Sequence, residues 1–176
     1  MMILKTVLKP ALLAAAVALT LAGCQKAESP MANVPTEIDA QTACSLDGMT
    51  LADYPGPKAQ IRYAGEAKPA YFCDTVEMFS ALLRPEQVKK VESVFVQDMG
   101  QADWDNPRGH WIDARTALYV HGSSRKGSMG PTIAAFAQAA DAEKFAASYG
   151  GKVLKFADVK PDMVDLGGGS SHDSKM

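Results

Sequence analysis

The sequence lacks the motifs that identify the commonest enzyme classes. It contains no Gly-x-Ser-x-Gly segment, no glycine-rich phosphate-binding loop and no Cys-x-x-Cys pair, which are signatures of serine hydrolases, nucleotide-binding proteins and thiol oxidoreductases. It also lacks a basic patch or arginine cluster, and its 18 Lys and Arg residues are outnumbered by 20 Asp and Glu. We therefore expect neither an enzyme nor a protein that binds nucleic acid.

Zinc and calcium sites are equally unsupported by the sequence. The chain has three cysteines and three histidines, too few and too scattered for the regular spacing of a four-ligand zinc site. No loop gathers the carboxylates that calcium requires. Sulfur in another form is plentiful, because the chain has nine methionines. Thiolate and thioether sulfur are the soft ligands that suit Cu(I).

Residues 1–23 have the features of a bacterial lipoprotein signal peptide. Lys5 and Lys9 give a basic N-terminal region, and it is followed by an apolar run, residues 11–21, that is too short to span a bilayer. The run ends in Leu21-Ala22-Gly23-Cys24, which resembles the lipobox after which cleavage leaves Cys24 as the lipid-bearing N-terminus. An ordinary signal peptide with an incidental cysteine is the alternative. Gln25 follows in place of the Asp that resembles an inner-membrane retention signal, and this favours the outer membrane.

The remaining residues are enough for one compact domain or two small ones with a shared core. Residues 24–42 are polar and without hydrophobic period, which predicts a flexible tether. Residues 167–176 are rich in Gly and Ser and are predicted to be a disordered tail. Between them the same order of elements occurs twice, over 43–101 and 102–166. The predicted fold class is α+β, with two β-β-α-β units packed together.

The predicted elements follow hydrophobic period and capping residues. In the first unit, strands at 59–64, 70–73 and 94–96 surround a helix at 75–83, with Asp74 as its N-cap and Glu77 in capping-box spacing. In the second unit, strands at 117–120, 133–136 and 153–156 surround a helix that Asp141 caps and that runs to Tyr149. A glycine-rich loop, residues 122–130, lies between the first two of these strands.

Candidate soft-metal ligands lie in loops, next to glycine. The segment Cys44-Ser45-Leu46-Asp47-Gly48-Met49 places a thiol and a thioether five residues apart, and Met99-Gly100 and Met129-Gly130 repeat the Met–Gly junction. Core methionines usually lie inside helices or strands, as Met78 is predicted to do, so core packing is the alternative for these three. His121 opens the loop that carries Met129, and His110 lies downstream of Met99.

Cys44 and Cys73 leave two other interpretations open. In an oxidising compartment two cysteines usually form a disulfide, and the protein would then be a lipid-tethered binding or scaffold protein without a metal. Cys73 also precedes a capped helix, whose dipole can lower a thiol pKa, so a thiol nucleophile is the third hypothesis.

A series of short motifs, in order along residues 43–157, carries a family resemblance. They are Cys44-x-x-x-Gly48-Met49, Tyr54-Pro55-Gly56-Pro57-Lys58-Ala59-Gln60-Ile61, Phe72-Cys73-Asp74-Thr75, Val96-Gln97-Asp98-Met99-Gly100, Asp103-Trp104, Trp111-Ile112-Asp113-Ala114, Tyr119-Val120 and Gly127-Ser128-Met129-Gly130. The chain resembles NosL, the family of copper-binding accessory lipoproteins of nitrous oxide reductase.

The resemblance implies a monomeric, lipid-anchored periplasmic Cu(I) chaperone with two β-β-α-β units. It implies delivery of copper towards nitrous oxide reductase with the help of an ABC-type membrane machinery. Family members often show Cys-x-x-Cys-Gly-Met, whereas here Asp47 precedes Gly48, so one cysteine of that motif is absent. We rank the candidate copper ligands as Met99, Met49, Met129, Cys44, Cys73 and His121, with His110 last.

Overall fold

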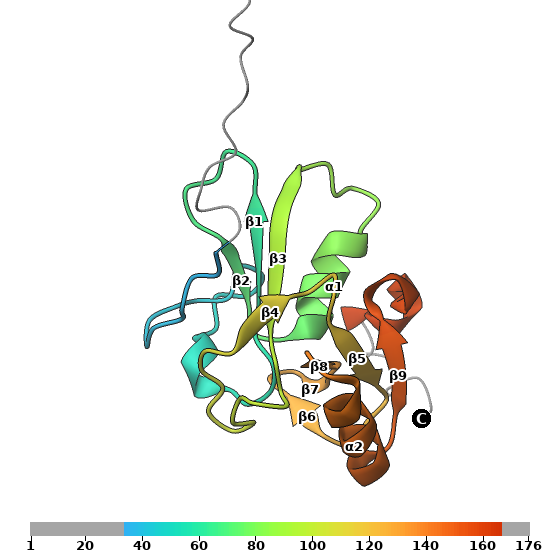
Figure 1. Ribbon diagram of the computed structural model, residues 1–176. Coiled ribbons are helices and arrows are strands. Elements are labelled where there is room, and N and C mark those ends of the chain that lie inside the picture. Colours follow the sequence, from blue (N-terminus) through green and yellow to red (C-terminus); the bar gives the residue numbers. More distant parts are fainter. Residues whose placement is uncertain (1–33, 167–176) are drawn as a thin grey trace, which may run out of the picture.

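The structure, a computed structural model, describes residues 34–166, which form a four-stranded sheet, a three-stranded sheet, a two-stranded hairpin, two α-helices and three 3-10 turns (Figure 1). The predicted signal peptide, the lipidation site Cys24, most of the predicted tether and the predicted tail at 167–176 lie outside the described residues. Across residues 34–166, no helix has the length and apolar character needed to cross a membrane.

The first sheet has four strands in the order β2-β1-β3-β4. Its elements are β1 (Ala59–Tyr63), β2 (Ala70–Phe72), α1 (Thr75–Leu83), β3 (Val91–Gln97) and β4 (Trp111–Asp113), preceded by the 3-10 turn η1 (Leu51–Asp53). Each neighbouring pair is antiparallel. Strand β4 was not predicted, and it comes from residues beyond 101, so the chain returns to the first sheet after leaving it.

The second sheet has three antiparallel strands in the order β8-β5-β9. Its half of the chain contains β5 (Leu118–His121), a small hairpin of β6 (Lys126–Gly127) and β7 (Gly130–Pro131), β8 (Ala134–Phe136), α2 (Ala139–Tyr149) and β9 (Lys152–Lys155). The turns η2 (Phe156–Asp158) and η3 (Pro161–Met163) follow. In both halves the first strand lies at the centre of three, with the second and third strands on either side. The predicted α+β class is confirmed.

Helix α1 joins the two sheets into one core (Figure 1). Met78 and Phe79 on its inner face are buried, and the Phe79 ring lies 5.0 Å from that of Tyr119 in β5 and 5.2 Å from that of Phe156 after β9. The same core contains Ile61 of the first sheet. Neither half could bury this much apolar surface alone, which is why two small units share one core.

The structure confirms one detail of the predicted helix caps and changes two. Asp74 does cap α1, because its side chain accepts a hydrogen bond from Val76 N at 2.9 Å. Glu77, however, accepts from the N–H of Cys73 (3.0 Å) and not from that of the N-cap residue, so no capping box forms. Helix α2 begins at Ala139 with Gln138 as its N-cap, and Asp141 lies inside the first turn.

The end of the predicted tether packs against the first sheet. Thr36 exchanges two 2.9 Å hydrogen bonds with the side chain of Gln60 in β1, and Trp111 Nε1 donates to Glu37 Oε2 (3.0 Å). Ile38 is buried. The tether prediction for 24–42 was therefore wrong for residues 36–42. These residues are polar and were therefore predicted to be solvent-exposed, but polar side chains on the outer face of β1 need hydrogen-bond partners and find them here.

The hairpin β6–β7 sits too close to α1 to admit a side chain at Gly127. A Cβ there would overlap Asp74 Oδ2 and lie 2.9 Å from Thr132 Cβ. We expect Gly127→Ala to lower the free energy of unfolding by about 1–3 kcal/mol, the usual cost of overpacking, in urea denaturation. Ser128→Ala in the same hairpin is the control. Its buried hydroxyl has no hydrogen-bond partner, so its loss should cost nothing. Equal stability of G127A and wild type would contradict the close packing.

Candidate metal site

The loop Cys44–Met49 is a closed turn at the edge of the first sheet. A backbone bridge joins Ala43 to Thr50, Cys44 N donates to Met49 O (2.8 Å), and Gly48 N donates to Cys44 O (2.9 Å). Gly48 has φ +77°, a left-handed conformation that favours glycine. This closure turns the Cys44 side chain inward, where only 3% of the residue is exposed.

Cys73 and Glu77 come to the same place from β2 and α1. Cys73 directly follows β2 and is fully buried, and Glu77 lies one helical turn further on, 1% exposed. The Cys44 and Cys73 sulfurs and a carboxylate oxygen of Glu77 all lie within 4.8 Å of one another. Among the described residues this is the one such group of three or more His, Cys, Asp or Glu side chains.

Both cysteines are free thiols in the structure. The disulfide hypothesis therefore identified the correct neighbours but not their chemical state. Cys44 Sγ donates to Glu77 Oε2 (3.3 Å), and Cys73 Sγ donates to the backbone oxygen of Met49 (3.7 Å). The two thiol sulfurs are soft donors of the kind that Cu(I) prefers, and a carboxylate lies beside them.

The three groups shift one another's proton affinities. A hydrogen bond from Cys73 lowers the pKa of Cys44 to about 6, and the same pairing raises the pKa of Cys73. Burial, followed by the charge of Cys44, raises the pKa of Glu77 to about 8. The proton affinities of Cys44, Cys73 and Glu77 are therefore coupled, and the cluster titrates as a unit.

A buried lysine lies beside this cluster. Lys58 is 0% exposed, and its Nζ donates to Pro55 O and to Cys73 O, both at 3.0 Å. Burial lowers the pKa of Lys58 to about 8, while the charges of Cys73, Asp74 and Glu77 act against that shift. A positive charge is held in the interior where the cysteines and acids gather, which offsets part of the cost of burying an anion there.

Met49, the first of the Met–Gly junctions, packs against the cysteines. It is half-buried in a cluster formed by Ile38, Cys44, Leu51 and Cys73. The loop that carries Met49 therefore packs against one side of the group formed by Cys44, Cys73 and Glu77, called the thiol cluster from here on. Of the predicted ligands, the structure brings Cys44, Cys73 and Met49 together here.

Met129 and His121 lie at a different place, on the wall of a cavity of about 540 Å³. Met129 occupies the two-residue turn between β6 and β7, and it is 59% exposed. His121 ends β5 and is half-buried. The same cavity is lined by Met163, Asp74 and Glu77. Glu77 thus belongs both to the thiol cluster and to the cavity wall.

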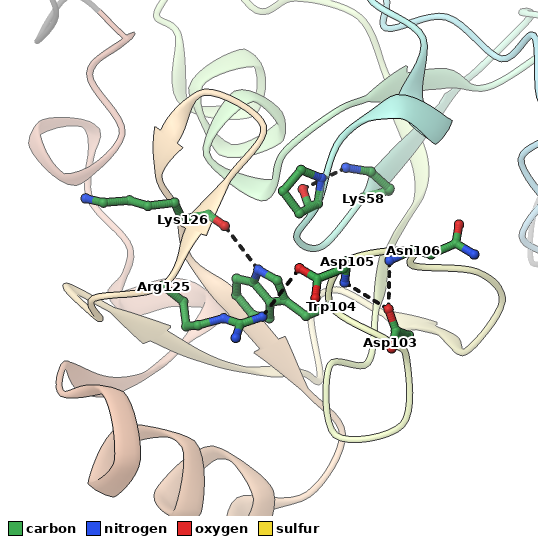
Figure 2. A network of polar contacts seen from close by, with 8 residues as sticks. Lys58, Asp103, Trp104, Asp105, Asn106, Arg125 and Lys126 are labelled. Atoms are coloured by element: carbon green, nitrogen blue, oxygen red, sulfur yellow. Dashed lines mark hydrogen bonds and ion pairs between the residues drawn. The ribbon is translucent and has the colours of Figure 1, made fainter.

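A polar and aromatic network fixes the base of the Met129 hairpin (Figure 2). Trp104 Nε1 donates to Lys126 O (3.1 Å), and the Arg125 guanidinium lies 4.5 Å from the Trp104 ring centre and 4.0 Å from Asp105. Asp103 holds the turn by accepting from the N–H groups of the two residues beyond Trp104. The hairpin is therefore anchored at its strands, and its tip projects into solvent.

Met99 and His110 lie apart from both groups. Met99 is half-buried against the cluster that contains Phe136 and Trp104, and its N–H donates to Ala135 O (2.8 Å). His110 is exposed with φ +53°. The sequence search overlooked Glu77, because its spacing from Asp74 was interpreted as a helix cap. That spacing was the available signal, since an acid one turn after a Cys-Asp pair faces back towards them.

Comparisons with known proteins agree on one family. A family model described as NosL matches residues 35–164. The chain is 37% identical over 164 residues to the copper-binding lipoprotein NosL of Stutzerimonas stutzeri (92% of this chain, 85% of that protein) and 38% identical over 165 residues to that of Achromobacter cycloclastes (92% and 84%).

A solved structure matches as well. The crystal structure of the copper chaperone NosL from Shewanella denitrificans is similar with a TM-score of 0.71 and 40% sequence identity, over 73% of this chain and 97% of that one. The family resemblance inferred from the motifs is confirmed, and the chain belongs to the NosL family.

Proposed function

We propose that this protein is a lipid-anchored periplasmic Cu(I) chaperone that carries copper towards nitrous oxide reductase, and that it is not an enzyme. The observation that carries the proposal is the buried group of two free thiols and a carboxylate within 4.8 Å. The names of the relatives, copper-binding lipoprotein and copper chaperone, support it.

The dimensions of the group suit a metal held between two sulfurs. Thiolate sulfur binds zinc at about 2.3 Å, so two sulfurs that share a metal of similar size lie at most about 4.6 Å apart, which the limit of 4.8 Å accommodates. A dithiolate that holds Cu(I) carries one net negative charge. The side chain of Lys58, whose Nζ donates to Cys73 O, lies beside the site and offsets part of that charge.

The surroundings suit temporary storage of a metal that must be passed on. Burial of Cys44 and Cys73 keeps water and oxidants away from the bound ion. The Cys44–Met49 loop is short and lies at a sheet edge, so its opening would expose one sulfur without unfolding the core. We propose Cys24 as the lipid attachment point, outer-membrane anchoring, a monomeric state, and an ABC-type membrane machinery and nitrous oxide reductase as partners.

Deletion of the gene in its own host tests the delivery role. We expect the nitrous oxide reductase purified from the deletion strain to contain less copper and to have less activity than the wild-type enzyme, with its polypeptide still exported. Restoring the intact gene should return the copper, whereas a Cys44→Ser/Cys73→Ser gene should not. A reductase with full copper content in the deletion strain would contradict the proposal.

A further inference from the structure

Among residues 34–166, Lys58 is the one lysine that is buried, and its burial calls for an explanation. The residue is 0% exposed at the start of β1. Taking an ammonium group out of water is costly even when it finds hydrogen bonds, and an apolar side chain of similar length would avoid that cost. The position therefore holds a positive charge where stability alone would not favour one.

The charge of Lys58 is fixed in place at both ends of the residue. Nζ donates to Pro55 O and to Cys73 O, both at 3.0 Å. The backbone N–H of Lys58 donates to Oε1 of Gln97 (3.0 Å), and Gln97 is itself fully buried. An ammonium offers three donors and no acceptor, so two carbonyl oxygens suit its charged form. The positive charge is thus held in the interior, turned towards Cys73.

The ammonium lies near the place where the two sulfurs would hold a metal. The O and Sγ atoms of one cysteine are at most about 5 Å apart, so Nζ of Lys58 lies within about 8 Å of Cys73 Sγ. A metal bonded to that sulfur at about 2.3 Å is then within about 10 Å of Nζ. Because the lysine and the cysteine are both buried, water screens little of the interaction between the two charges.

The effect of this charge depends on the charge of the bound ion. Thiolates are ligands of Zn(II) as well as of Cu(I), so the sulfurs alone do not exclude zinc. The ammonium of Lys58 repels a divalent ion about twice as strongly as a monovalent ion at the same place. This difference remains whatever the protonation of the acids around the site, because it comes from Lys58 and the ion only.

We propose that Lys58 is a specificity-determining residue, whose fixed positive charge makes the thiol cluster favour monovalent Cu(I) over divalent Zn(II). The inference rests on the proposed function, because it takes Cys44 and Cys73 as the groups that hold the ion. Lys58 acts through its electric field and through the Cys73 carbonyl, so it is a positioning residue and forms no bond to the metal.

Lys58→Gln tests the inference, because it keeps a hydrogen-bond donor and removes the charge. The dissociation constants for Cu(I) and for Zn(II) are measured separately on the full chain in detergent at pH 7, without oxygen, by competition with chromophoric chelators. We expect the ratio of Zn(II) affinity to Cu(I) affinity to rise at least about tenfold, which is the effect of one unit charge at about 10 Å with an effective dielectric constant of about 20.

Three further variants separate charge from shape. Lys58→Arg keeps the charge, and Lys152→Gln removes an exposed lysine of β9 and so makes the same change in net charge; both should keep the wild-type ratio. Lys58→Met is a second neutral variant if circular dichroism shows that Lys58→Gln is unfolded. A purely structural Lys58 would lower both affinities together. An unchanged ratio in a folded neutral variant, or an equal shift in Lys58→Arg, would overturn the inference.

The wild-type protein gives a test that needs no variant at this position. Placed in buffers that set equal free concentrations of the two ions, it should contain Cu(I) in native mass spectra, and a protein loaded mainly with Zn(II) would overturn the inference. Failure of the proposed function has a different signature, since Cys44→Ser/Cys73→Ser would then bind Cu(I) as tightly as wild type.

Discussion

Replacing either cysteine with serine is expected to weaken Cu(I) binding by more than the roughly 100-fold that changes outside the ligand set cost. Cys44 and Cys73 supply both thiolates of the buried group, and serine keeps the shape while offering a hard hydroxyl. The measurement is a competition titration of the soluble protein, lacking residues 1–24, against a chromophoric Cu(I) chelator under reducing conditions.

The control for this experiment is Met78→Leu. Met78 is fully buried in α1 and belongs to the hydrophobic core, so its replacement conserves volume and leaves the thiol cluster intact. Oxidation of wild type to a Cys44–Cys73 disulfide should abolish binding to the same degree, because both sulfurs are then consumed. Retention of wild-type affinity by C44S and C73S would contradict a site built on these thiols.

Much of the fold could be predicted from the sequence, because the hydrophobic patterns and the helix caps indicated the same elements. Alternation of apolar and polar residues predicted β1 near its observed bounds, and a capped amphipathic stretch predicted α1 at Thr75–Leu83. Strand β4 was missed because Trp111–Asp113 is three residues long and stays partly exposed. The packing of residues 36–42 was missed because their partners, Gln60 and Arg62, are polar groups on a face that hydropathy treats as solvent-exposed.

The candidate site was harder to predict from the sequence, because the fold, and not the spacing of residues along the chain, brings its side chains together. Cys44 and Cys73 meet because the loop before η1 pairs with the end of β2, where Ser45 N donates to Tyr71 O (2.7 Å). The Met–Gly junctions suggested a common site. The three junctions are alike only because glycine is common in turns. The structure places Met49, Met99 and Met129 in three different surroundings.

Glu77→Gln is expected to change the pH dependence of stability more than any other single substitution near the cluster. Burial raises the pKa of Glu77 from 4.5 to about 8 in the folded protein, so the folded state holds a proton that the unfolded state releases. The stability from this group is complete below about pH 4.5 and is lost as the pH rises through about 8. At 1.36 kcal/mol per pKa unit, the shift from 4.5 to about 8 sets an upper limit of about 5 kcal/mol on the loss, and coupling to Cys44 lowers the loss below that limit.

Glutamine keeps the shape of Glu77 and an oxygen that accepts from Cys73 N, but it does not titrate. Urea unfolding of wild type and E77Q between pH 4.5 and 9, with both cysteines kept reduced, should therefore give curves that diverge with rising pH, E77Q becoming the more stable protein at pH 8 and above. Burial also raises the pKa of Asp74, to about 6. Asp74 is present in both proteins, so its own titration cancels from the difference in their free energies of unfolding. Parallel curves would contradict this, because they would show that Glu77 ionises near its ordinary pKa in the folded protein and that burial does not hold its proton beside the thiols.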